Sequence, residues 1–267
     1  MKKVLLPIIF LALIASCKKN DAPAPKNILD QVVTKQGTDS VIIKYTYDAA
    51  NRFVGEVSND PINNETYTKT IARDNSGRVT KITDVEATST PYTTVTDFIY
   101  LGATDAKLKN GKSSFVQSGV TIFDSSAYEY SGTQATKTSH YWSTSTVAYT
   151  LINYYVYTYD ARGNIASVKY YQVGTPGLND FKLLYTVTYT YDDKINPILA
   201  KDDALIEYIG SQYVCPNNVT GLSYSDAVTP ANNFTVAITY EYRSDGRPTK
   251  STTTIGGSSS VSTYTYR

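Results

Sequence analysis

Apolar and polar residues alternate with a period of two along most of the chain after residue 28. The pattern is plain in Val41–Tyr47, Tyr154–Tyr159, Tyr185–Tyr191, Thr235–Tyr242 and Val261–Tyr266. Because successive side chains of a β-strand point to opposite faces, this period predicts half-buried strands. Apart from Tyr154, the tyrosines of each segment fall on one face and the threonines on the other, so the chain is predicted to be all-β.

Turn sequences separate the predicted strands at intervals of about 8–12 residues, the spacing of an antiparallel meander. The turns at 47–52, 73–78, 159–164 and 242–247 align with one another, and each has Gly or Asn at the same offset. That offset suits a type I turn followed by a residue with positive φ. An Asp at the first position can accept hydrogen bonds from the following backbone N–H groups. The predicted turn residues are Asp48, Asn51, Asp74, Gly77, Asp160, Gly163 and Gly246.

The spacing implies about fourteen to sixteen antiparallel strands, connected mostly to their nearest neighbours. We expect residues 28–267 to form a single β domain, as a strongly curved sheet or an incomplete barrel. Asn196-Pro197 interrupts the repeat, and the apolar residues that follow recur at roughly helical spacing up to Ile209. We therefore expect one short helix or a structured loop near residues 197–209, which either covers the core or acts as a lid over a cavity.

The first sixteen residues have the pattern of a signal peptide. Met1-Lys2-Lys3 is a short positive region, and the apolar run 4–14, interrupted by Pro7, leads to the small residues Ala15-Ser16. This run is too short for a stable membrane-spanning helix, so we expect residues 1–16 to be removed.

The sequence Leu13-Ile14-Ala15-Ser16-Cys17 resembles the lipobox of bacterial lipoproteins. The resemblance implies that Cys17 is the lipidation site and that its several acyl chains anchor the protein durably at a membrane. Residues 17–27 would form a tether, because Pro/Ala alternation favours an extended spacer. The mature start Cys17-Lys18-Lys19-Asn20-Asp21 looks like that of Bacteroidota lipoproteins, which implies the outer membrane and favours the cell surface over the periplasmic face.

The repeated turns carry a second resemblance. Their pattern, Tyr-x-Tyr-Asp-x-x-Gly followed by Arg or Asn, resembles the YD repeat of RHS-type proteins, whose β-sheets curl into a shell. With the lipobox, the chain is similar to a Bacteroidota lipoprotein family of unknown function with a porin-like, curved antiparallel sheet. The segments 191–197 and 215–220 add to this likeness. The resemblance spans most of residues 40–267 and implies a fold without an activity.

Composition narrows the classes of function. The charges nearly cancel, with 25 Lys and Arg against 24 Asp and Glu, which argues against a nucleic-acid partner. Of the two cysteines, Cys215 has no partner for an intramolecular disulfide if Cys17 is lipidated. Cys215 is then either a buried small residue or a reactive thiol without a base nearby in sequence.

The tyrosine stripes admit two interpretations. They are cross-strand packing ladders, or they form an aromatic platform on which sugar rings stack. The densest aromatic cluster surrounds the only tryptophan, and its candidate ligand contacts are Trp142, Tyr141 and Tyr155. The competing interpretation of Trp142 is a side chain packed in the core.

An enzymatic alternative rests on carboxylates, because a glycoside hydrolase needs two of them, about 5–5.5 Å or 6.5–9.5 Å apart. Alternation predicts that most glutamates in strands point to solvent. His140 is the only histidine, so a hydrolase triad or a histidine-rich zinc site is poorly supported. We predict no catalytic residue, no metal site and no cofactor. The glutamates in strand-like segments are Glu56, Glu86, Glu129 and Glu241.

The leading hypothesis is a membrane-anchored envelope lipoprotein that acts as a non-enzymatic module. It would contact the membrane through the lipid on Cys17 and bind a glycan, a peptide or a partner protein. The alternatives are a lipid-anchored glycoside hydrolase with paired carboxylates and a purely structural or adhesion module. A concave aromatic patch that includes Trp142 would favour the leading hypothesis.

Overall fold

The computed structural model describes residues 28–88, 91–117, 120–174, 180–198 and 214–267. These residues form sixteen strands and one short 3-10 turn, η2 (Pro230–Asn232). The first eight strands are β1 (Leu29–Gln36), β2 (Asp39–Tyr47), β3 (Phe53–Asp60), β4 (Glu65–Arg73), β5 (Val79–Ala87), β6 (Tyr92–Tyr100), β7 (Leu108–Gln117) and β8 (Val120–Ser131). The others are β9 (Gln134–Ser143), β10 (Thr150–Tyr159), β11 (Ile165–Val173), β12 (Phe181–Ile195), β13 (Asn217–Asp226), β14 (Phe234–Tyr242), β15 (Pro248–Ile255) and β16 (Ser258–Tyr266).

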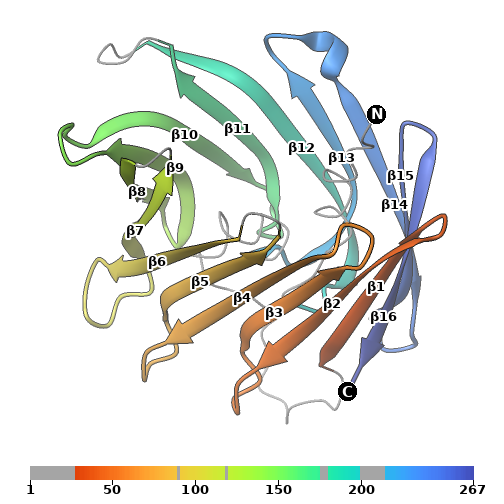
Figure 1. The fold of residues 1–267 in the computed structure, drawn as a ribbon. Helices are drawn as coiled ribbons and strands as arrows, with labels where there is room; N and C mark the ends of the chain where they lie inside the picture. Colours follow the sequence, from red (N-terminus) through yellow and green to blue (C-terminus); the bar gives the residue numbers. More distant parts are fainter. Residues whose placement is uncertain (1–27, 89–90, 118–119, 175–179, 199–213) are drawn as a thin grey trace.

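The strands form one closed barrel (Figure 1). Each strand pairs antiparallel with its neighbours in sequence, and β1 pairs with β16, where Val32 lies opposite Tyr264. The prediction of an all-β antiparallel meander is confirmed, whereas the prediction of an open curved sheet or an incomplete barrel is wrong. Pairing of β1 with β16 satisfies the backbone N–H and C=O groups that an open sheet leaves free at its two edges.

Most tyrosines of the strands point into the barrel, and most threonines of the alternating segments point out. In β14, Val236 and Ile238 are 4% and 3% exposed, while Thr235 and Thr239, which flank this pair, are exposed. Burying the larger apolar area inside the closed sheet is favourable by roughly 25 cal/mol per Å² of apolar surface. The outer wall is consequently rich in threonine, serine and charged side chains, including the cross-strand ion pair Lys250–Glu241.

The repeated turns have the conformation that their sequences predict. Asn51 has φ of 59°, and Gly77, Gly163 and Gly246 have φ of 91°, 88° and 81°. Beside the first turn, the Asp48 carboxylate accepts hydrogen bonds from the backbone N–H groups of Ala50 and Arg52. Asp74 and Asp160 accept the equivalent bonds in their turns.

These turns lie at one end of the barrel, which we call the tyrosine end, where all even-numbered strands finish. Every strand pairing that begins there has a register shift near that end, as a β-bulge produces. Several tyrosines near strand ends donate their phenol hydrogen to a carbonyl at the start of the preceding strand. Tyr100 bonds Val79 O at 2.9 Å, and Tyr266 bonds Pro248 O at 2.7 Å. Tyrosines near the turns thus satisfy carbonyl groups at the starts of neighbouring strands, whereas Tyr242 bonds the Asp192 carboxylate instead.

The barrel interior is filled near the tyrosine end. The main buried cluster contains Leu29, Phe53 and Ile82, each 0% exposed. The long connection between β12 and β13 contributes Ile198 to this cluster, with 1% exposure, and Val214 packs against it. The predicted helix or structured loop at 197–209 lies almost entirely outside the described residues, and the described Pro197 and Ile198 are not helical.

At the opposite end, which we call the open end, inward-facing side chains remain accessible to solvent. Trp142 and Phe234 are 42% and 36% exposed, and Tyr92 is 53% exposed. All three belong to the inner wall, because they lie on the same face of their strands as buried core residues. The interior therefore changes from a packed core at the tyrosine end to a solvent-accessible wall at the open end.

Candidate functional site

A continuous row of aromatic rings crosses the inner wall towards the open end. Consecutive ring centroids lie 5.7, 4.9, 4.9, 5.2 and 5.0 Å apart, and each ring comes from a different strand between β9 and β14. We call this set the aromatic row; its members are His140, Tyr155, Tyr170, Tyr185, Tyr224 and Phe234.

The rings of the row cover one another's faces. Tyr170 stacks on Tyr185 with 24° between the planes, and Tyr224 stacks on Phe234 with 13°. Rings that stack around the wall present their edges and hydroxyl groups to the interior instead of their faces. Burial raises the pKa of Tyr170, Tyr185 and Tyr224, so these phenols stay protonated and can donate hydrogen bonds. The rings of the row therefore pack as a cross-strand ladder that offers a line of hydroxyls to the interior, and a platform for stacking sugar rings stays a prediction.

The structure separates the three aromatic residues that the sequence groups together. Trp142 faces inwards, since it lies opposite Asp124 of β8, and Tyr155 belongs to the aromatic row. Tyr141 lies between the inward-facing His140 and Trp142, so its side chain is on the outer wall. Trp142 and Tyr155 therefore belong to the candidate site and Tyr141 does not.

The glutamates of the enzymatic alternative divide between the two faces. Glu129 and Glu241 pair with Lys137 and Lys250 on the outer wall, both at 2.6 Å. Glu56 is 7% exposed and faces inwards. Glu86 also faces inwards, opposite Tyr67. Only Glu56 and Glu86 could therefore meet a ligand inside the barrel.

A charged cluster lies on the inner wall of β3, β4 and β5. Lys69 Nζ lies 2.5 Å from Asp84 Oδ1, and its side chain is 1% exposed. Tyr67 donates a hydrogen bond to the same carboxylate, and Glu56 lies directly opposite Lys69 on β3. The ammonium group thus has two carboxylates on neighbouring strands, which compensates the cost of burying all three charges.

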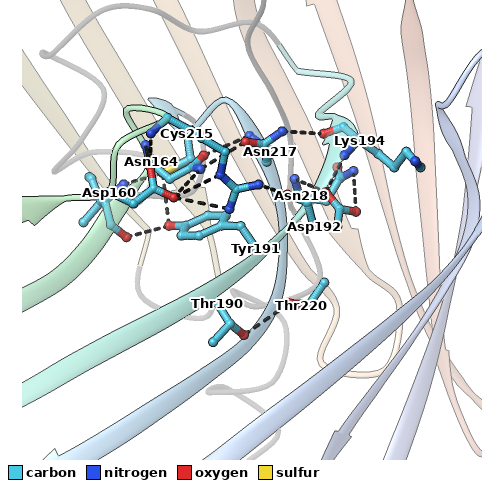
Figure 2. Close-up of polar contacts among 12 residues, drawn as sticks. Asp160, Asn164, Thr190, Tyr191, Asp192, Lys194, Cys215, Asn217, Asn218 and Thr220 are labelled. Carbon is cyan, nitrogen blue, oxygen red and sulfur yellow. Dashed lines mark hydrogen bonds and ion pairs between the residues drawn. The ribbon is translucent and has the colours of Figure 1, made fainter.

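A second polar cluster, which we call the junction, closes the base of the long β12–β13 connection (Figure 2). Asp192 accepts hydrogen bonds from the backbone N–H groups of Lys194 and Asn218, at 2.9 and 3.1 Å. Its other oxygen accepts bonds from the Asn218 amide and from the Tyr242 hydroxyl. One carboxylate therefore joins β12, β13 and β14 at the tyrosine end.

The junction also contains the side chains of Asn164 and Asn196 and the Tyr191 hydroxyl, which surround Cys215. Asn164 bonds the backbone N–H of Asn217 at 3.0 Å, and Asn196 bonds the Cys215 carbonyl at 3.1 Å. The Cys215 Sγ lies 3.2 Å from the Tyr191 hydroxyl, and the residue is 0% exposed. The sequence contains this cluster as Asp192 and Cys215-Pro216-Asn217-Asn218, but no local rule predicts that the two segments meet.

Neither a metal-binding cluster nor a membrane-spanning helix is present in the part of the chain that the structure describes. Among the described residues, no group of three or more His, Cys, Asp and Glu side chains could hold a metal ion. No helix in the described ranges is long and apolar enough to cross a membrane.

Comparison with known proteins places the fold. No family model matches the chain, and no curated protein matches it. A porin-like protein from Bacteroides vulgatus aligns over 90% of this chain and 99% of its own, with a TM-score of 0.54 and 12% identity. A porin-like protein from Bacteroides uniformis aligns over 91% and 98%, with a TM-score of 0.53 and 12% identity. At this identity the likeness concerns the fold alone, and the chain shares its barrel fold with porin-like proteins of Bacteroides.

Proposed function

We propose that the protein is a non-enzymatic binding protein of the bacterial envelope that takes its ligand at the open end of the barrel. The observation that carries this proposal is the aromatic row, with Trp142 beside it, on a wall that solvent reaches. Ligand sites are typically concave and aromatic, with a few polar groups that set orientation. The row supplies apolar ring edges and neutral phenol hydroxyls, which suit a glycan or a peptide.

The outer wall supports a barrel that stands in water. A barrel that crosses a membrane has an apolar, lipid-facing band about 25 Å tall. On β14 the outward positions are instead Thr235, Ala237, Thr239 and Glu241, all exposed. We therefore propose that the lipid on Cys17 anchors the protein to the outer membrane, with the cell surface as its favoured side. Residues 1–16 would be the signal peptide and 17–27 the tether.

Replacing Cys17 tests the anchor. In the producing bacterium, Cys17→Ser is expected to abolish incorporation of radiolabelled palmitate and to move the protein from the detergent phase to the aqueous phase on Triton X-114 partition. The physical reason is that the acyl chains on Cys17 would hold the protein at the membrane. Cys215→Ser is the matched control and should remain in the detergent phase. A Cys17→Ser protein that stays there would refute the lipid anchor.

Two adjacent tyrosines test the binding site. Tyr170 is in the aromatic row, while Tyr171 stacks on Tyr154 of the outer wall at 4.7 Å. We expect Tyr170→Ala to weaken ligand binding at least tenfold and Tyr171→Ala to change it by less than twofold. The ligand is first selected by applying the whole mature chain, in detergent, to glycan and peptide arrays. Affinity is then measured by titrating the fluorescence of Trp142, the only tryptophan.

Tyr170→Ala removes ring contacts with Tyr155 and Tyr185, and Tyr171→Ala removes one with Tyr154. The unfolding free energy of both variants is therefore measured first, and affinities are compared at a temperature at which both are folded. A difference in affinity between the two variants then shows that the ligand contacts the inner wall, and it is not caused by unfolding of one variant. Equal affinities for the two variants, or no selected ligand on either array, would contradict a binding site on the aromatic row.

A further inference from the structure

Asp124 is an inward-facing carboxylate without a lysine or arginine partner among the described residues. It lies on the same face of β8 as Tyr128, which packs against the core. Its one ion-pair contact in the described ranges is to His140 Nδ1, 3.8 Å from Oδ1, and an imidazole offsets a carboxylate only when it is protonated. The carboxylate of Asp84 on the same wall has the ammonium group of Lys69. The Asp124 side chain is only 16% exposed, so water solvates its negative charge poorly. A cation beside the carboxylate would therefore be stabilising.

Two aromatic rings flank this carboxylate. Trp142 of β9 lies directly opposite Asp124, and Phe115 comes from β7 on the other side of β8. The two rings meet edge to face, with centroids 6.3 Å apart and 76° between their planes. Trp142 nevertheless keeps 42% of its surface exposed at the open end. The faces of indole and phenyl rings carry negative potential and attract cations within about 6 Å of the ring centre.

A second oxygen beside this site lacks a donor. Asn153 of β10 lies opposite His140, and its Oδ1 is buried without a hydrogen-bond partner. The Oδ1 of Asp124 is likewise buried without a hydrogen-bond partner. Within a short stretch of β8, β9 and β10, the inner wall thus offers hydrogen-bond acceptors and aromatic rings. In the described part of the chain, no lysine or arginine side chain makes an ion pair there.

We propose that Asp124, Trp142 and Phe115 form a subsite for an organic cation, an ammonium group carried by the ligand. The carboxylate supplies the counter-charge, and the two rings cover the apolar surface around the nitrogen. This proposal rests on the proposed function, because it names the chemistry of a group that binds at the open end. It excludes a wholly neutral sugar as the complete ligand.

Choline and its neutral isostere test the subsite. In 3,3-dimethylbutan-1-ol a carbon atom replaces the charged nitrogen, so the two molecules have nearly the same shape. Each is titrated against the whole mature protein while Trp142 fluorescence is recorded. We expect choline to give a saturable change in fluorescence and the alcohol to bind at least tenfold more weakly. Because this comparison uses the unaltered protein, it does not depend on the folding of any variant.

Two isosteric variants test whether the Asp124 carboxylate supplies the counter-charge for choline. Asp124→Asn is expected to weaken choline binding at least tenfold. Asp97→Asn is the control, since Asp97 lies on the outer wall, with its side chain 63% exposed beside Lys81; it should leave choline affinity unchanged. Equal binding of choline and the alcohol, no saturable binding of choline, or no effect of Asp124→Asn would each overturn the subsite. A neutral array ligand that depends on Tyr170 but not on Asp124 would leave the proposed function standing and refute the cation subsite alone.

Discussion

Replacing Lys69 by methionine is expected to lower the free energy of unfolding by about 3–5 kcal/mol, the usual cost of removing one partner from a buried ion pair. The methionine side chain has similar length, so packing changes little. What it removes is the ammonium group 2.5 Å from Asp84 and opposite Glu56. Both carboxylates would remain on the inner wall without their cation. Urea denaturation followed by tyrosine and tryptophan fluorescence measures the loss.

Lys137→Met is the matched control for Lys69. Lys137 makes the same kind of cross-strand pair, 2.6 Å from Glu129, but the two side chains are 31% and 62% exposed. Exposed pairs contribute about 0.2–1 kcal/mol, because water solvates the separated charges. A Lys69→Met protein as stable as Lys137→Met would show that the inner wall is well hydrated and that the charged cluster is not a buried one.

Removal of the Asp192 carboxylate is expected to open the junction. Asp192→Ala loses four hydrogen bonds to one ionised acceptor, from Lys194, Asn218 (twice) and Tyr242. Bonds to charged groups contribute roughly 1.5–3 kcal/mol each and are not additive, so we expect a loss of about 3 kcal/mol in unfolding free energy. Strands β12, β13 and β14 would then be less firmly joined at the tyrosine end.

Thiol labelling reports this opening locally. Cys215 is 0% exposed inside the junction, and in a Cys17→Ser background it is the only thiol. We expect maleimide to label Cys215 at least tenfold faster in Asp192→Ala. Asp193→Ala is the control, because that side chain is 79% exposed and contacts only Lys194 within the described ion pairs. Equal labelling rates in the two variants would show that Asp192 does not hold the connection in place.

Local sequence rules predicted the elements well where a single strand or turn contains the whole signal. The alternation of Tyr and Thr in residues 185–191 predicts a two-faced strand, and β12 has that form. Asn51 and Gly163 mark turns because positive φ is cheap only for such residues, and both have it. The hydrogen bonds of Tyr100 and Tyr266 to carbonyls of the preceding strands depend on strand pairing, which no local pattern predicts.

The candidate site was predicted less completely, because its members come from different strands. Closeness in sequence groups Tyr141 with Trp142 and Tyr155, but the strand pairing places Tyr141 on the outer wall. Glu56 and Glu129 both lie in strand-like segments, yet one is buried inside and the other is paired outside. Bulges beside the turns shift the alternation by one residue, so the face of a side chain cannot be read from a run of letters alone.

By itself, the sequence determined that the chain forms antiparallel hairpins with a tyrosine face and a threonine face, since period and turn chemistry act within a few residues. Only the tertiary structure decided that the hairpins close into a barrel, because the pairing of β1 with β16 joins residues more than two hundred positions apart. Closure decided which face became the interior. It also brought His140, Tyr170 and Phe234 onto one wall, since strand order and register, and not local preference, determine which rings meet.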